Sequence, residues 1–120
     1  MIKLAEKIID QKDIDDLKTW LDTSEVYTKG KETVQFEREW SKWLGCEYSV
    51  FVNSGSSANL LVMLGMLYSG RLKNKKVIVP AVSWVTTVSP AMQLGFEPIL
   101  CDCDKDDLGL DLQDFENLCK

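Results

Sequence analysis

The segment from Val50 to Leu61 constrains the possible folds of this chain most strongly, because it joins a strand pattern to a helix pattern through a short turn. Residues 47–52 are β-branched and aromatic, which favours a strand. The turn Asn53-Ser54-Gly55-Ser56 contains turn and N-cap formers, and a rich apolar helix pattern follows from Ser57 to Gly70. The sequence therefore predicts a strand–turn–helix unit.

The predicted helix start has the features of an anion-binding site. The first backbone N–H groups of a helix have no partner within it, and its dipole is positive at this end. The hydroxyl groups of Ser54, Ser56 and Ser57 stand beside them. We expect the amides of Ser56 and Ser57 to face open space, where they could bind a phosphate. An ordinary serine-rich N-cap is the alternative interpretation, and spacing alone leaves both open.

Composition excludes several classes of protein. Hydrophobic residues make up 45% and charged residues 28% of the 120 residues, as in a soluble globular protein. A net charge of −5 without a basic cluster argues against nucleic-acid or acidic-membrane partners. No apolar run is long enough to span a bilayer, and the charged first residues do not resemble a signal peptide. We expect a cytoplasmic protein.

The chain contains four cysteines and no histidine. Cys101 and Cys103 alternate on a strand pattern, which is not a zinc-ligand spacing, and the other two cysteines stand alone. Ordinary buried or half-buried thiols and no metal site are expected. Without histidine, these residues cannot form a Ser/His or Cys/His nucleophile. The pair Glu37 and Glu39 is expected on a solvated helix face rather than in acid–base catalysis.

The remaining patterns predict an incomplete α/β domain after a helical segment, with the division at residues 1–45 and 46–120. Strands alternating with helices are typical of a mainly parallel sheet with right-handed crossovers. Three strands would leave the sheet edges unpaired, so we expect an unfinished sheet and a poorly folding isolated chain. The further expected elements are helices at 13–21, 33–44, 83–94 with an interruption at Pro90, and a last one capped by Asp111, and strands at 77–79 and 98–102.

Five stretches follow one another in a fixed order: Phe36-Glu37, Leu44-Gly45, Asn53–Asn59, Val79–Thr87 and Gly95–Asp102. Together they resemble the nucleotide-sugar aminotransferases of the DegT/DnrJ/StrS family, which are pyridoxal-phosphate enzymes. The resemblance runs from about Tyr27 to about Phe115. The Gly-Ser-Ser-Ala-Asn sequence also resembles the branch that contains deoxysugar 3-dehydrases, so both reactions remain open.

This resemblance implies part of a type I pyridoxal-phosphate fold, a three-layer sandwich with a mainly parallel sheet, and an active site shared across a homodimer. Gly55, Ser56 and Ser57 match the turn that holds the cofactor phosphate. Trp84 matches the aromatic residue that stacks on the pyridine ring. Its place just beyond a parallel strand is where such sheets bind ligands. A core tryptophan is the alternative.

The resemblance also implies what these residues lack. The family's Schiff-base lysine and the acidic partner of the pyridine nitrogen lie beyond residue 120, so no catalytic residue is expected here. Asn74-Lys75-Lys76 replaces the family's usual Gly-Asp, and neither these lysines nor Lys73 and Lys105 match a catalytic position.

We expect the N-terminal segment of an aminotransferase that uses an amino donor and a nucleotide-linked keto sugar. Its pathway would be deoxy-aminosugar or surface polysaccharide biosynthesis, such as that of lipopolysaccharide, and the segment would be inactive alone. The alternatives are a 3-dehydrase segment, or a non-catalytic module that complements a separately encoded C-terminal half.

Overall fold

The computed structural model describes residue 6 and residues 8–120. The chain divides into two compact units, Met1–Phe51 and Val52–Lys120, and each is described here by itself. The boundary predicted between residues 45 and 46 stays a prediction.

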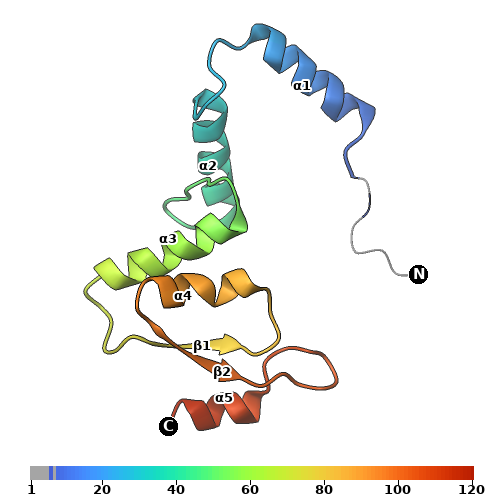
Figure 1. Ribbon diagram of the computed structural model, residues 1–120. Helices are drawn as coiled ribbons and strands as arrows, with labels where there is room; N and C mark the ends of the chain where they lie inside the picture. Colours follow the sequence, from blue (N-terminus) through green and yellow to red (C-terminus); the bar gives the residue numbers. More distant parts are fainter. Residues whose placement is uncertain (1–5, 7) are drawn as a thin grey trace. The chain divides into compact units, whose positions relative to one another are not determined.

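The first unit contains helices α1, Gln11–Thr23, and α2, Lys31–Leu44 (Figure 1). Asp10 caps α1 by accepting from the N–H of Asp13 at 3.0 Å, and the Asp13 carboxylate accepts from the N–H of Asp10 at 2.9 Å. This reciprocal pair satisfies two donors at the helix start. Gly45 ends α2 with a φ of 74°, a left-handed conformation that glycine adopts without strain. Both predicted helices are confirmed, and each begins two residues earlier than expected.

An aromatic row follows one side of α2. The rings of Phe36 and Trp40 stack with centroids 5.9 Å apart, and Trp40 lies 5.0 Å from Trp43. Phe51, at the end of the unit, meets Phe36 edge-on at 5.5 Å. All four side chains remain exposed. The row therefore stabilises the unit as a surface cluster of aromatic pairs, not as an enclosed core.

The strand predicted at residues 47–52 is wrong, because the structure leaves this segment as a loop. The N–H of Phe51 donates to the Glu37 carboxylate at 2.9 Å instead of to a neighbouring strand. β-propensity describes how well residues suit a pleated surface, and it forms a strand only where a ladder partner is available. Across residue 6 and residues 8–120, the single sheet consists of β1 and β2 alone.

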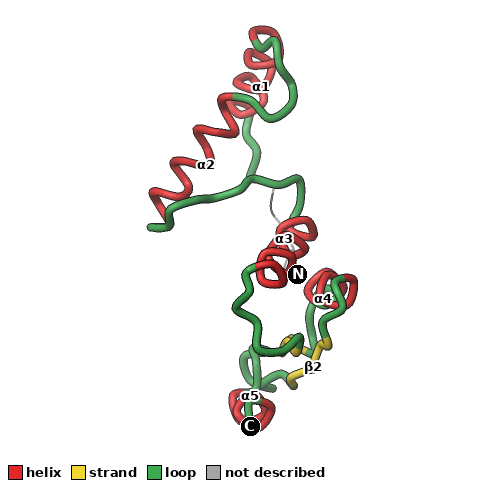
Figure 2. The backbone as a smooth tube through the Cα atoms, turned by 90° about the vertical axis from the view of Figure 1, so that its left-hand side faces the viewer, coloured by secondary structure: helices red, strands yellow, loops and turns green. Residues whose placement is uncertain are grey.

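The second unit is an α/β arrangement whose elements are α3, Gly55–Tyr68; β1, Lys76–Pro80; the 3₁₀ helix η1, Val85–Thr87; α4, Ser89–Gln93; β2, Glu97–Cys101; and α5, Leu112–Leu118. Strands β1 and β2 pair in parallel, in a register that sets Lys76 opposite Glu97 and Pro80 opposite Cys101. Helices α4 and α5 contact β2 from opposite sides, and α3 lies beside α4 (Figures 1 and 2). The predicted parallel pairing is confirmed.

The buried core of this unit lies where α4 meets the strands. Its fully enclosed apolar side chains come from β1, α4, the following turn and β2. The apolar run of β1 fits a parallel strand covered on both faces. The core residues are Val79, Ala91, Phe96 and Cys101.

The helix predicted at 83–94 is wrong as a single element, because η1 and α4 replace it with a break at Val88. Pro90 does not interrupt the second helix but lies in its first turn. A proline fits there because the first N–H groups of a helix need no partner within it. The strand predicted at 98–102 forms one residue earlier, at 97–101. Asp111 caps α5 as predicted, accepting from the N–H of Asp114 at 2.9 Å.

Apolar side chains also remain on the outside of this unit. Helix α3 is apolar around its whole circumference, and Val62 and Met66 are exposed on it, as is Leu100 on β2. A helix of this kind is normally covered on all sides. The unit therefore presents more apolar surface than a self-contained domain does.

We expect the isolated 120-residue chain to bind an apolar fluorescent dye and to self-associate. Replacing Val62 and Met66 together by glutamate should reduce both effects, because it places charge on the exposed face of α3. Dye fluorescence and light scattering after gel filtration measure the two effects. A dye-free monomer with one sharp thermal transition would contradict this expectation.

Candidate functional site

The site begins at the first turn of α3, which starts at Gly55 and not at Ser57 as predicted. Ser54 is the N-cap, with extended φ and ψ of −163° and 159°, and its Oγ accepts from the N–H of Ser57 at 3.2 Å. Serine is a preferred N-cap, so the first suitable serine of the run takes this position. The two serines after it are thereby drawn into the helix.

A hydrogen-bond network fixes the shape of this turn. Asn53 Oδ1 accepts from the hydroxyl of Ser57 at 2.6 Å and from that of Ser54 at 3.2 Å. Ser57 thus uses both its amide and its hydroxyl within the protein. The expectation that its amide faces open space is wrong, because the Ser57 N–H donates to the capping hydroxyl of Ser54. The side chain of Asn53 orients the turn from outside the helix.

Gly55 and Ser56 provide the open donors. In the described part of the chain, neither of their N–H groups has an acceptor. A Cβ placed on Gly55 would meet no heavy atom within 4 Å, so there is free space beside the helix start. Two free amides, the exposed Ser56 side chain and the positive end of the helix dipole form a donor set that suits a phosphate. These residues fit the phosphate group of the expected cofactor.

Trp84 is the second predicted element of the site. It follows β1 by one short turn and forms the N-cap of η1, with extended φ and ψ of −68° and 143°. Its side chain is 75% exposed, so the alternative of a core tryptophan does not hold in this structure. An exposed indole ring beyond the carboxyl end of a parallel strand can cover a flat aromatic ligand.

The structure connects these two elements through Asn59, a residue that the sequence analysis did not single out. Its Nδ2 donates to the carbonyl of Thr86 at 3.0 Å, across 27 positions of the chain. Asn59 lies one helical turn after Gly55, and Thr86 belongs to the turn that Trp84 begins. No sequence signal could reveal this contact, because its acceptor is a backbone carbonyl.

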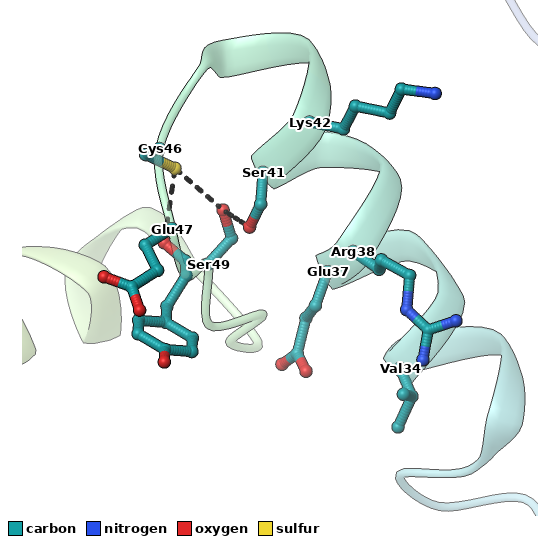
Figure 3. A pocket seen from close by; sticks show the side chains of 9 residues that line it. Val34, Glu37, Arg38, Ser41, Lys42, Cys46, Glu47 and Ser49 are labelled. Carbon is teal, nitrogen blue, oxygen red and sulfur yellow. Dashed lines mark hydrogen bonds between the residues drawn. The ribbon is translucent and has the colours of Figure 1, made fainter.

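A separate open hollow of about 460 Å³ lies within the first unit (Figure 3). The hydroxyls of Ser41 and Ser49 share a hydrogen bond of 2.8 Å across it, and Cys46 Sγ donates to the Tyr48 carbonyl at 3.3 Å. These bonds close the loop after α2 onto the helix. The lining residues are Val34, Glu37, Arg38, Ser41, Lys42, Cys46, Glu47, Tyr48 and Ser49.

Glu37 lines this hollow and links α2 to the segments before and after it. Its carboxylate accepts from Lys29 Nζ at 2.8 Å and from the Phe51 N–H at 2.9 Å, and its side chain is only 16% exposed. The predicted solvated position is therefore wrong for Glu37. The bond from Lys29, and then that from the Phe51 amide, lower the pKa of the Glu37 carboxyl, because both favour its charged form.

All four thiols are free, and Cys101 is buried and Cys103 half-buried, as predicted. The prediction is wrong for Cys46 and Cys119, which are exposed because they lie in surface segments at the ends of helices. Cys101 is buried at the end of β2, and burial, followed by the carboxylates of Asp114, Asp111 and Asp102, raises the pKa of its thiol. Such a thiol is unreactive, because the thiolate is the reactive form. Among the residues that the structure describes, no His, Cys, Asp and Glu side chains form a metal-binding cluster, and no helix has the length and apolar character needed to cross a bilayer.

The comparison with known proteins decides the family. The model of the DegT/DnrJ/EryC1/StrS aminotransferase family matches residues 7–120. The chain belongs to this family. It is 38% identical over 112 residues to a GDP-4-keto-6-deoxy-D-mannose 3-dehydratase of Yersinia pseudotuberculosis, covering 91% of the chain and 28% of that relative. The same enzyme of Escherichia coli O55:H7 is 38% identical over 93 residues, covering 75% of this chain and 24% of the relative.

Solved structures of such enzymes share the fold. A GDP-4-keto-6-deoxymannose-3-dehydratase (ColD) mutant with bound GDP-perosamine superposes with a TM-score of 0.84 at 32% identity, over 96% of this chain and 30% of that one. The Helicobacter pylori aminotransferase PseC gives 0.81 at 25% identity, over 97% and 30%. The chain is thus the N-terminal part of a type I pyridoxal-phosphate fold, as predicted, and spans less than a third of these relatives.

The cap of α3 gives a direct test of the turn. Ser54→Ala should destabilise the protein by about 1 kcal/mol, because it removes the acceptor of the Ser57 N–H. Ser56→Ala is the matched control and should change stability little. Urea unfolding followed by circular dichroism compares the two variants. Equal stability of the two would contradict the assignment of Ser54 as the cap.

Glu37 gives a second test, through pH. Its pKa is lowered by folding, so its contribution to stability is present above its ordinary value of 4.5 and is lost as the pH falls through the folded value. Lys29→Met should raise the titration midpoint of the Glu37 carboxyl, which ¹³C NMR measures. It should also reduce the stability difference between pH 7 and pH 3. An unchanged midpoint would contradict the role of Lys29.

Proposed function

We propose that this chain supplies the phosphate- and ring-binding segment of a pyridoxal-phosphate enzyme that acts on a nucleotide-linked keto sugar. The observation that carries the proposal is the pair of open amides at Gly55 and Ser56, in a helix whose Asn59 is hydrogen-bonded to the turn that carries the exposed Trp84. The family match over residues 7–120 supports the same assignment.

Each site residue has a defined task in this proposal. The N–H groups of Gly55 and Ser56 and the Ser56 hydroxyl bind the phosphate, whose charge the dipole of α3 stabilises. Ser57 holds the shape of the turn through its bonds to Ser54 and Asn53. The ring of Trp84 covers one face of the pyridine and keeps water from it. When bound, pyridoxal phosphate supplies an electron sink for chemistry at the substrate carbon.

Two reactions are open to the whole enzyme. Transfer of an amino group from a donor to the keto sugar is the first candidate, and the family supports it. Dehydration at C3 is the second candidate, favoured by the 32% identity to the solved 3-dehydratase ColD against 25% to PseC. Either reaction would serve deoxysugar or surface polysaccharide biosynthesis, including that of lipopolysaccharide.

A further part of the proposal concerns partners. The lysines Lys73, Lys75, Lys76 and Lys105 are all exposed, and none has the burial that a Schiff-base lysine needs. The catalytic lysine or its replacement would come from a C-terminal part, either of the same enzyme or encoded separately. We also propose a homodimer, as the family resemblance implies, and a cytoplasmic location, as the composition suggests.

Binding of pyridoxal phosphate tests the proposal. We expect weak binding to the 120-residue chain, with scattered, substoichiometric lysine labelling after borohydride reduction. Trp84→Ala should weaken binding about tenfold, because it removes the stacking surface. Trp43→Ala is the matched control, since Trp43 is equally exposed at 75%. Absorbance titration and peptide mapping measure both effects.

Two outcomes would contradict the proposal. The first is equal affinity of the Trp84→Ala and Trp43→Ala variants, which would remove Trp84 from the site. The second is stoichiometric labelling of a single lysine together with turnover of a keto sugar, which would show that the segment is a complete enzyme.

A further inference from the structure

Helix α3 and the turn that carries Trp84 meet at one long-range side-chain hydrogen bond. Asn59 Nδ2 donates to the Thr86 carbonyl at 3.0 Å. The other hydrogen bonds of the phosphate-binding turn are local, between residues no more than four positions apart. The contact of Asn59 therefore joins the two halves of the site.

The acceptor belongs to the same short turn as the backbone of Trp84. The N–H of Thr87 donates to the Trp84 carbonyl at 2.9 Å, which closes the 3₁₀ turn around Thr86. Because the Trp84 side chain is largely exposed, its own packing does little to fix the ring. The position of the ring then depends on the backbone turn, and Asn59 holds that turn.

Packing around Asn59 is incomplete, which gives the hydrogen bond more importance. A hollow of about 180 Å³ lies between α3 and β1 at this point, bordered by Asn59, Val62, Val79 and Thr87. Side chains that do not meet across a gap lose the contacts that would fix their elements relative to each other. The hydrogen bond bridges α3 and η1 beside this hollow.

A ligand with a phosphate close to a flat ring makes strict demands on spacing. Its two ends reinforce each other only when the protein presents both contacts at the matching separation. Asn59 lies three and four residues after Ser56 and Gly55, which places it on their side of α3. It is therefore placed to hold the phosphate donors at a fixed separation from the ring.

We propose that Asn59 is a positioning residue that sets the separation between the phosphate-binding amides and the Trp84 ring. This inference rests on the proposed function. Asn59 does not touch the cofactor but acts through the Thr86 carbonyl. Only its N–H donor is needed, so an aspartate of the same shape abolishes the bond and sets a charge against the carbonyl oxygen.

Matched variants and three probes test the inference in the full chain. The variants are Asn59→Asp, Asn59→Leu and the control Thr86→Val, which leaves the backbone acceptor in place. The probes are pyridoxine 5′-phosphate, which lacks the reactive aldehyde, inorganic phosphate alone, and pyridoxine alone. NMR titration gives the affinities, and the indole N–H signal of Trp84, assigned with Trp84→Phe, reports on the ring.

Both Asn59 variants should bind pyridoxine 5′-phosphate about tenfold more weakly, as expected for one lost hydrogen bond. Their affinities for phosphate alone and for pyridoxine alone should stay within about twofold of wild type, because each half of the site is intact. The Trp84 indole signal should shift, while those of Trp20, Trp40 and Trp43 remain. Thr86→Val should behave as wild type.

The outcomes separate the inference from the proposed function. Unchanged affinity of the Asn59 variants for pyridoxine 5′-phosphate would overturn the inference alone. Loss of affinity for inorganic phosphate as well would also overturn it, because Asn59 would then support the turn itself. A wild-type chain that binds inorganic phosphate but gains nothing from the attached ring would overturn the proposed function, and the inference with it.

Discussion

The hydrogen bond from the Ser57 N–H to Ser54 Oγ determines the arrangement of the candidate site. By fixing Ser54 as the cap, it starts α3 at Gly55 and leaves the first two amides of the helix open. Asn53 supports the cap by holding the hydroxyls of both serines. The number of open amides at the turn thus depends on which serine caps the helix, and not on the number of serines.

The parallel pairing of β1 and β2 supplies the second half of the arrangement. This pairing fixes β1, which ends at Pro80, and the turn that carries Trp84 follows directly after it. The bond from Asn59 to Thr86 then ties this turn to α3. The candidate site therefore depends on a cap, a strand pair and one side-chain hydrogen bond, which together place the turn before α3 and the Trp84 turn in one unit.

The described residues offer open backbone donors at the start of α3 and an exposed ring at Trp84, and Lys73, Lys75, Lys76 and Lys105 are exposed. In the proposed function the donors and the ring bind the cofactor. The relatives of the chain include 3-dehydratases as well as an aminotransferase. The ion pair of the exposed Lys29 and the half-buried Glu37 has a structural role, because Glu37 also accepts from the Phe51 N–H.

The sequence by itself determined what depends on neighbours within one turn: the stop of α2 at Gly45, the cap of α5 at Asp111, the apolar strand β1, and the small-residue turn before α3. Tertiary structure decided whatever needs a distant partner. Residues 47–52 have the pattern of a strand but no ladder partner in the sheet of the described residues, so they remain a loop. Glu37 and Asn59 acquired their roles from backbone groups 14 and 27 positions away, which no local pattern encodes.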